Sequence, residues 1–94
     1  MNVLRRIRQK IIDRDYYLSV HAEEEMLDDG LERVDIESAI LNGNIEKKLT
    51  EDVRGTRYRI QGPATDGRTI RVVCRFQVFG NLILITAYAL EVEI

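Results

Sequence analysis

A two-residue alternation of side chains between residues 56 and 88 constrains the fold more than any other feature of this sequence. At its start, Arg57 and Arg59 alternate with Tyr58 and Ile60. Successive side chains of a β-strand point to opposite faces of a sheet, so the arginines would share one face and the apolar side chains the other. This stretch is therefore predicted to be a strand with one apolar side.

Two further stretches extend the pattern into a sheet. Residues 68–78 alternate in the same way, with Ile70, Val72, Cys74 and Phe76 on one side and Arg71, Val73, Arg75 and Gln77 on the other. Residues 82–88 are apolar on both sides, which is typical of a strand near the middle of a sheet. Glycine-containing turns separate the stretches and favour hairpins. The sequence therefore predicts an antiparallel sheet with an apolar face and an arginine face.

The charge is polarised along the chain. The 94 residues fit a single domain spanning residues 1–94, and the formal net charge is −2. The segments 1–18, 19–52 and 53–78 carry net charges of +3, −8 and +5. The overall acidity argues against a protein that binds nucleic acid over its whole surface. Because salt screens charges beyond roughly 10 Å, the basic sheet could still attract a polyanion locally.

Cysteine usage and hydropathy indicate the compartment. The single cysteine, Cys74, cannot form an internal disulfide and lies in an apolar alternation, which indicates a buried thiol and a reducing environment. The first residues are too often interrupted by arginine for a signal peptide, and no segment is long enough to span a membrane. We therefore expect a cytoplasmic protein with no membrane contact.

Three helices are predicted before the sheet. Residues 2–13 have apolar side chains at helical spacing and basic side chains mostly outside. Residues 20–28 follow Ser19, whose hydroxyl would cap the helix start, and Gly30 would end that helix in a left-handed conformation. Residues 31–41 form the third helix. Helices followed by strands predict an α+β fold, with the N-terminal helices packed on one face of a three- to four-stranded antiparallel sheet.

Two shorter stretches have a weaker pattern. Residues 15–18 connect the first two helices and are expected to be a linker. Residues 45–49 could form a short, charged edge strand. An exposed edge offers free backbone groups for pairing, so self-association as a homodimer through this stretch remains an alternative.

His21 is the only histidine, and Glu25 follows it by one helical turn. Side chains four residues apart meet on a helix, so the carboxylate could orient the imidazole for general acid–base work. The pair is poor as a metal site because no further histidine or useful cysteine is available, and neither a metal nor another cofactor is expected. The alternative is structural: His21 hydrogen-bonds a nearby backbone group and supports the helix start.

The arginines of the predicted strands are candidate anion-binding residues. Arg57, Arg59, Arg71 and Arg75 share side-chain parity, so they cluster if the strands pair in register. A guanidinium group donates two parallel hydrogen bonds to a phosphate or a carboxylate. Tyr88 ends the last strand, where its hydroxyl could reach the same side. The alternative is that these arginines pair with the chain's own acidic residues.

A set of short motifs runs through residues 5–90. They are Ser19-Val20-His21-Ala22, Met26 to Gly30, Ala39 to Gly43, Glu46, Arg54 to Gly62, Asp66-Gly67-Arg68, Val72-Val73-Cys74 and Ile85 to Tyr88. In this order and spacing they resemble the small bacterial domain-of-unknown-function family 4258 (DUF4258). That family is similar to the RelE/ParE-like and BrnT-like toxin superfamily, in which two helices pack on a curved antiparallel sheet. The resemblance implies a RelE-like scaffold.

Two functions follow as expectations from the resemblance and the candidate residues. Several members of that superfamily cleave RNA, and others bind an antitoxin or attack gyrase. In the first, the protein is a metal-independent endoribonuclease toxin: the strand arginines hold the scissile phosphate, and His21, oriented by Glu25, moves the proton of the attacking 2′-hydroxyl. In the second, it is a non-catalytic binding module that engages an acidic, antitoxin-like protein through its arginine face, which its net negative charge motivates.

Overall fold

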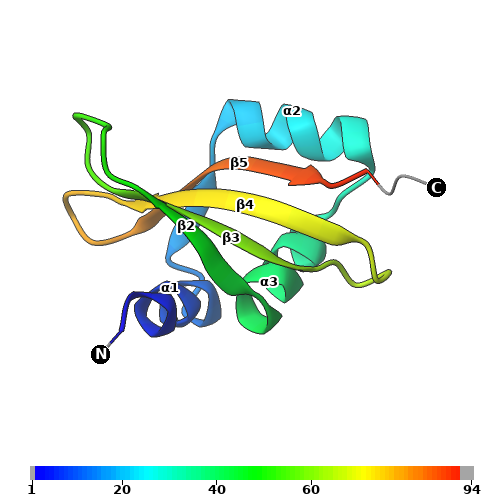
Figure 1. Cartoon of the computed structure of the whole chain (residues 1–94), viewed down its shortest axis with the longest axis horizontal. Helices are drawn as coiled ribbons and strands as arrows, with labels where there is room; N and C mark the ends of the chain where they lie inside the picture. The colour runs from blue at the N-terminus through cyan, green and yellow to red at the C-terminus, as the bar shows by residue number, and fades with distance from the viewer. Residues whose placement is uncertain (1, 92–94) are drawn as a thin grey trace.

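Three helices lie in the first half of the chain. The computed structural model describes residues 2–91 (Figure 1). The helices are α1 (Val3–Ile12), α2 (Val20–Asp29) and α3 (Arg33–Asn42). The Ser19 hydroxyl accepts the Ala22 N–H, and Gly30 ends α2 with a left-handed φ of 64°, so both predicted caps are confirmed. None of the helices in the described residues is long and apolar enough to cross a membrane.

The five strands that the structure describes form one mixed sheet. They are β1 (Tyr16–Leu18), β2 (Asn44–Leu49), β3 (Arg57–Pro63), β4 (Thr69–Phe76) and β5 (Leu82–Ala89). Their order in the sheet is β1-β5-β4-β3-β2. The four longer strands pair antiparallel, whereas β1 pairs with β5 in parallel. The α+β class is correct, but the expected three- to four-stranded antiparallel sheet has a fifth, parallel strand.

The stretch expected as a linker contains this additional strand. Tyr16 and Leu18 lie opposite Leu82 and Leu84 of β5. Three residues are too few for a recognisable alternation, and the strand with which they pair lies near the other end of the chain. The extended conformation of β1 therefore depends on long-range contacts that a local pattern does not contain.

The apolar core lies between the helices and one face of the sheet. Helices α1 and α3 lie on that side, and α2 runs along β5 (Figure 1). The strands contribute the buried residues Ile60, Ile70, Val72, Cys74, Leu82, Leu84 and Ala87. Burial raises the pKa of the Cys74 thiol to about 12, so the thiol stays protonated and acts as a small apolar side chain.

Helix α3 packs onto β3 so closely that two glycines are required. A Cβ atom on Gly62 would collide with the backbone carbonyl of Ala39. One on Gly43 would collide with the carbonyls of both Ala39 and Gln61. The two positions have ordinary negative φ or extended backbone, so the requirement is space and not conformation. Glycine lets the helix and the strand approach at backbone distance.

Helix α2 covers the edge of β5 beyond β1. Glu25 Oε1 accepts the Ala87 N–H at 3.2 Å, and Asp29 Oδ2 accepts the Ala89 N–H at 2.9 Å. The two carboxylates lie one turn apart on the same face of the helix. The two amides lie two residues apart on the same side of the strand, so each carboxylate meets one amide. Side chains of α2 thus satisfy backbone groups that another strand would otherwise pair.

Arg8 points inward, although the basic side chains of α1 are expected mostly outside. Its Nε donates to Ile40 O at 3.1 Å, and its Nη2 donates to Gly43 O at 2.6 Å. These carbonyls belong to the end of α3, whose last turn has no basic residue. Arg8 therefore satisfies free carbonyls and complements the negative end of the α3 dipole.

Candidate functional site

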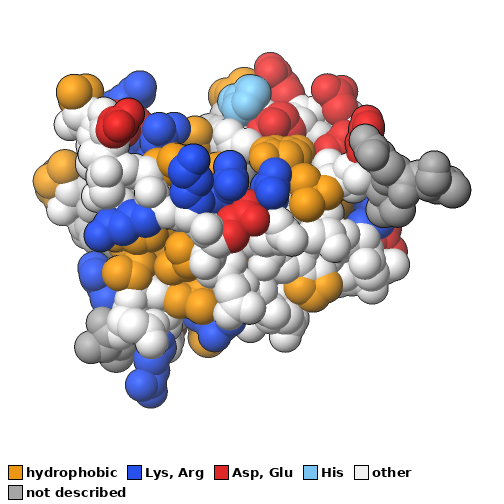
Figure 2. All heavy atoms as spheres, viewed as in Figure 1, with side chains coloured by type: hydrophobic (Ala, Val, Ile, Leu, Met, Phe, Trp, Pro, Cys, Tyr) orange, Lys and Arg blue, Asp and Glu red, His pale blue; other side chains and the backbone are white. Residues whose placement is uncertain are grey.

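The four candidate arginines lie on one face of the sheet. Arg57 and Arg59 belong to β3, and Arg71 and Arg75 belong to β4. The register places Arg59 opposite Val73, which lies between the two β4 arginines. All four alternate with core residues and so point away from the core. Figure 2 shows Lys and Arg side chains gathered across this face over β3 and β4. These four residues are called the arginine face below.

Glu46 bridges the two strands of the arginine face. Its Oε1 lies 2.6 Å from Arg59 Nε and 2.5 Å from Arg71 Nε. It reaches both because the pairing of β2 with β3 shifts register between Ile45 and Lys47, and such a bulge redirects a side chain. The spacing of Arg59 and Arg71 therefore accommodates one carboxylate between two strands.

Asp52, in the turn between β2 and β3, supplies a second carboxylate. Its Oδ2 lies 3.4 Å from Arg57 Nε, and its Oδ1 lies 3.6 Å from Arg54 Nε. The pKa of Asp52 is lowered, first by the hydrogen bond from the Arg54 backbone N–H and then by the charges of Arg54, Arg57 and Arg75. This carboxylate therefore remains ionised at neutral pH.

The charge of the arginine face is only partly neutralised. Within residues 2–91, its ion pairs are those with Glu46 and Asp52, and Arg75 forms none. Arg57 Nε and Arg59 Nε are buried and have no hydrogen-bond acceptor. Glu46 is close enough to Arg59 for a charge contact, but the Arg59 Nε–H is not directed at it. The Arg57, Arg59 and Arg71 side chains are 28–34% exposed, so the face remains accessible to a further anion.

Tyr88 adjoins the arginine face from β5. It lies opposite Arg71 in the register, and its backbone parity turns the ring to the open side of the sheet. The Tyr88 side chain, followed by Glu46, raises the pKa of Arg71. The Arg71 side chain donates to Gln61 Oε1 at 3.3 Å and to Glu46 Oε2 at 3.4 Å, and Tyr88 belongs to the same surface.

His21 lies at the margin of this surface. Its Nε2 is 3.2 Å from Glu25 Oε1, and the two side chains are 65% and 24% exposed. Because Glu25 also accepts the Ala87 N–H, its carboxylate is held in place. Figure 2 shows the histidine on the same side of the molecule as the basic side chains, with apolar side chains between them. In the described residues, no hydrogen bond or ion pair joins His21 to the arginine face.

A pocket of about 210 Å³ opens beside β2. It is lined by Lys47, Lys48, Leu49, Thr50, Glu51 and Arg57. It meets the arginine face at Arg57 and contains neither His21 nor Glu25. No three His, Cys, Asp or Glu side chains between residues 2 and 91 are arranged to hold a metal ion.

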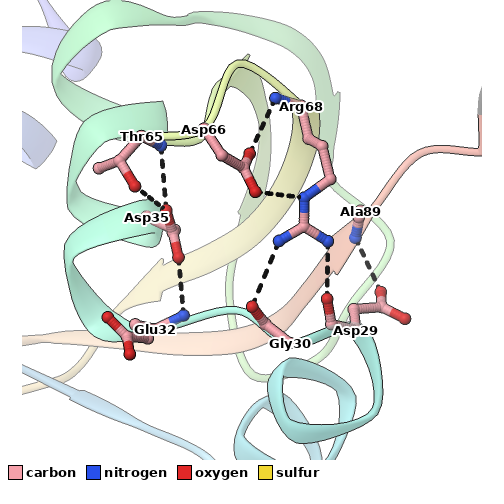
Figure 3. Close-up of polar contacts among 8 residues, drawn as sticks. All are labelled: Asp29, Gly30, Glu32, Asp35, Thr65, Asp66, Arg68 and Ala89. Atoms are coloured by element: carbon pink, nitrogen blue, oxygen red, sulfur yellow. Dashed lines mark hydrogen bonds and ion pairs between the residues drawn. The ribbon is translucent and has the colours of Figure 1, made fainter.

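A second group of charged residues joins the turn between β3 and β4 to the junction of α2 and α3 (Figure 3). This junction cluster consists of Asp29, Gly30, Glu32, Asp35, Thr65, Asp66 and Arg68. Arg68 donates from Nε to Asp66 Oδ2 at 2.8 Å, from Nη1 to Asp29 O at 2.7 Å and from Nη2 to Gly30 O at 3.2 Å. The last two carbonyls end α2, so Arg68 caps that helix.

Asp35 is the buried centre of the junction cluster, with 5% exposure. Its carboxylate accepts hydrogen bonds from the Glu32 N–H, the Thr65 N–H and the Thr65 hydroxyl. The Thr65 hydroxyl is the main reason that the pKa of Asp35 is lowered. The donors around this carboxylate and the acceptors around Arg68 are already paired within the chain. We therefore assign the cluster a structural role.

Two aromatic residues near the arginine face were not indicated by its strand pattern. Tyr17 on β1 lies opposite Ile83, which lies opposite Arg75, so all three share one side of the sheet. Tyr17 is 44% exposed, and Phe79, in the turn between β4 and β5, is 97% exposed. Tyr17 could not be placed without recognising β1. The exposure of Phe79 could have been predicted from the sequence, because a large apolar residue beside a glycine in a turn lies away from the core.

Most of the chain matches a known protein family. Residues 18–89 match the family described as "Domain of unknown function (DUF4258)". No curated protein and no solved structure matches the chain. The matched segment runs from the end of β1 to the end of β5, so it contains both the His21–Glu25 pair and the whole arginine face. Because it spans more than half of the sequence, the chain belongs to the DUF4258 family.

Proposed function

We propose that the arginine face binds RNA and that the protein is a RelE-like, metal-independent endoribonuclease of the toxin–antitoxin type. The observation that carries the proposal is the arginine face itself: Arg57, Arg59, Arg71 and Arg75 project from two paired strands onto one accessible surface that their carboxylate partners only partly neutralise. A row of guanidinium groups fixed on a sheet is suited to the regularly spaced phosphates of a nucleic-acid strand.

The separate roles of the arginines and of His21 follow from the chemistry of RNA cleavage. The 2′-oxygen attacks the neighbouring phosphorus, the bond to the 5′-oxygen breaks, and a cyclic phosphate and a 5′-hydroxyl form. Arginines stabilise the negative charge that develops on the phosphate oxygens. His21, held by Glu25, accepts the 2′-hydroxyl proton and can return a proton to the leaving 5′-oxygen. Its 65% exposure leaves the ring available to a bound strand.

The test separates binding from cleavage. The double variant Arg59→Ala/Arg71→Ala should lose RNA affinity by at least about tenfold and show a weaker dependence of affinity on salt, because two phosphate contacts are removed. His21→Ala should retain affinity but lose cleavage by about 10²- to 10⁴-fold, the usual contribution of a general base. Cleavage is followed by the appearance of cyclic-phosphate ends, with EDTA present throughout.

Matched variants control for folding. Arg54→Ala removes an arginine that lies outside the arginine face and is 76% exposed, so it should leave affinity nearly unchanged. Circular dichroism should show the same fold for each variant. Wild-type affinity in the double variant would rule out the arginine face as the RNA site, and wild-type cleavage by His21→Ala would remove the histidine from the mechanism.

A second candidate function is a non-catalytic module that binds an acidic segment of an antitoxin-like protein. The observation in its favour is Glu46, which already bridges Arg59 and Arg71 as a partner's carboxylate would. Under this alternative, an acidic peptide competes for the face while His21→Ala has no effect on any activity. Growth arrest on expression, relieved by the product of a neighbouring gene, would favour the toxin; healthy growth and no RNA binding at low salt would favour the module.

A further inference from the structure

The turn between β4 and β5 holds an aromatic ring in solvent. Val78 and Phe79 are 96% and 97% exposed. A Phe side chain offers roughly 150–250 Å² of surface that is normally buried. At this position the ring makes little contact with the rest of the chain, so the fold does not require it. A large ring in such a place is free to pack against a partner.

The turn is ordered by its own hydrogen bonds. Gln77 N donates to Asn81 O at 2.7 Å, and Gly80 N donates to Gln77 O at 2.9 Å. Gly80 has a φ of 94°, which favours glycine. The Gln77 side chain also donates to the Tyr17 hydroxyl at 2.6 Å, which ties the turn to β1. Phe79 is therefore presented by a fixed turn, and its binding would cost little loop ordering.

The turn follows the end of β4 at which Arg75 lies, and its Gly80 also comes near Lys10 of α1, because a Cβ on Gly80 would lie 3.9 Å from Lys10 Nζ. Arg75 lies one residue before the end of β4, and Gly55 of the β2–β3 turn packs near its side chain, because a Cβ on Gly55 would lie 3.7 Å from Arg75 Cδ. The two turns project from the same end of the sheet (Figure 1). Figure 2 shows apolar side chains protruding there beside Lys and Arg side chains. The β2–β3 turn adds Val53, which is 100% exposed.

These observations indicate what kind of ligand would suit the arginine face together with the β4–β5 turn. The arginine face selects a chain of negative charges, and an exposed planar ring beside its end selects a planar apolar group on that chain. An unpaired nucleic-acid strand has both features, since its bases can stack on aromatic side chains. An acidic peptide offers the charge without an obligatory ring, and a duplex keeps its bases stacked on each other.

We propose that Phe79 is a base-stacking residue that gives the arginine face a preference for unpaired RNA. This inference rests on the proposed RNA-binding function and adds to it the class of RNA that the face accepts. Tyr17, which is hydrogen-bonded to the same turn and shares the side of Arg75, is positioned to adjoin the stacked base. The arginines supply affinity for the backbone, and Phe79 supplies the distinction between unpaired bases and a duplex.

Three probes test the proposal: a 2′-O-methyl oligouridine that cannot undergo the proposed cleavage, a base-free ribose-phosphate oligomer of equal length, and an RNA duplex. Phe79→Leu keeps an apolar side chain but removes the ring. It should weaken oligouridine binding by about 5- to 100-fold, which corresponds to the stacking of one base. Binding of the base-free oligomer and of the duplex should not change. Val78→Ala is the matched control in the same turn and should bind all three probes as the wild type does.

A fluorescent variant reports the contact directly. The chain contains no tryptophan, so Phe79→Trp introduces a single tryptophan, which can be excited selectively over the tyrosines and keeps an aromatic ring at this position. Its fluorescence should be quenched by the oligouridine and not by the base-free oligomer. Vesicles of anionic lipid should leave its emission unchanged; a blue shift with vesicles and no quenching by oligouridine would assign the turn to a membrane surface and overturn the proposal.

The outcomes distinguish the two claims. If the wild type binds both the oligouridine and the base-free oligomer, and Phe79→Leu binds them equally well, RNA binding stands and the stacking role is wrong. If the wild type binds neither oligomer at low salt, the RNA-binding function itself is wrong, and the role of Phe79 is rejected with it.

Discussion

The junction cluster and the arginine face contain the same kinds of side chain in opposite situations. Arg68 donates to one carboxylate and to two backbone carbonyls at the end of α2. Arg57 and Arg59 each form one ion pair, but their side chains stay 34% and 28% exposed, and Arg75 forms no ion pair in the described part of the chain. Arg71 lies between the two situations, because it donates to Gln61 and Glu46. The difference lies in the acceptors around each guanidinium group, because the charge is the same.

This comparison separates an arginine that the fold uses fully from arginines that it uses only in part. A guanidinium group whose donors are already paired stabilises the fold, whereas one with remaining donors can bind an external anion at little structural cost. Arg68, in the motif Asp66-Gly67-Arg68, is as noticeable in the sequence as Arg57 or Arg59. Its geometry (Figure 3) nevertheless assigns it to the scaffold.

The largest effect should come from Asp35→Ala in the junction cluster. The substitution empties a buried side-chain site and removes the acceptor of three hydrogen bonds from the partly buried Glu32 and Thr65 donors, and we expect a loss of about 2–3 kcal/mol in the free energy of unfolding. Urea unfolding followed by circular dichroism measures it. Glu24→Ala, on the exposed side of α2, is the control and should change stability by less than about 0.5 kcal/mol. A similarly small change for Asp35→Ala would mean that the cluster is not structural.

Arginine substitutions in the two regions should have opposite consequences. Arg68→Ala should lower the free energy of unfolding by about 1–2 kcal/mol, because the two carbonyls at the end of α2 lose their donors, and it should leave RNA affinity unchanged. Arg59→Ala should weaken RNA binding and alter stability by less than about 1 kcal/mol. Parallel unfolding and RNA titrations of both variants provide the measurement. An equal loss of stability in the two variants would contradict the distinction between the junction cluster and the arginine face.

A smaller effect is expected from Glu46→Gln. Removing this carboxylate exposes the charges of Arg59 and Arg71, so RNA affinity at low salt should rise by about 3- to 10-fold through the added electrostatic attraction. Stability should change little, because the ion pair lies on an accessible surface. A loss of affinity would indicate that Glu46 positions the arginines and does not compete with the ligand.

The smallest effect concerns pH. The pKa of Asp35 is lowered from its ordinary value of 3.8, so the unfolded chain takes up the proton first as the pH falls. The stability that the ionised carboxylate provides is therefore present at neutral pH and is lost progressively below about pH 4. Unfolding of the wild type and of Asp35→Asn between neutral and acid pH should show their difference shrinking toward low pH. A constant difference would mean that ionisation of Asp35 is irrelevant.

The sequence predicted the features that depend on local pattern. The parity of Arg57, Arg59, Arg71 and Arg75, the caps at Ser19 and Gly30, and the three hairpin strands follow from periodicity and from residue conformation. The helix bounds agree within two residues of the observed ones. These are the elements in which side chains near each other in sequence determine the structure.

The remaining features depend on partners that are distant in sequence. Strand β1 exists through its pairing with β5, and Arg8 and Arg68 cap helices that belong to other parts of the chain. The bulge that aims Glu46 at the arginine face arises from the pairing of β2 with β3. Glu25 was recognised as a partner for His21, but its hydrogen bond to Ala87 required the folded structure.

The cover that α2 places over β5 has a consequence for assembly. At that end the sheet offers a neighbouring molecule only the three residues of β1 before the helix begins, whereas β2 presents six residues at the opposite end. If two copies paired through β2, each copy would have no other long edge strand available for pairing. Growth by strand addition beyond such a pair would have only the short β1 edge to use, which disfavours extended assembly.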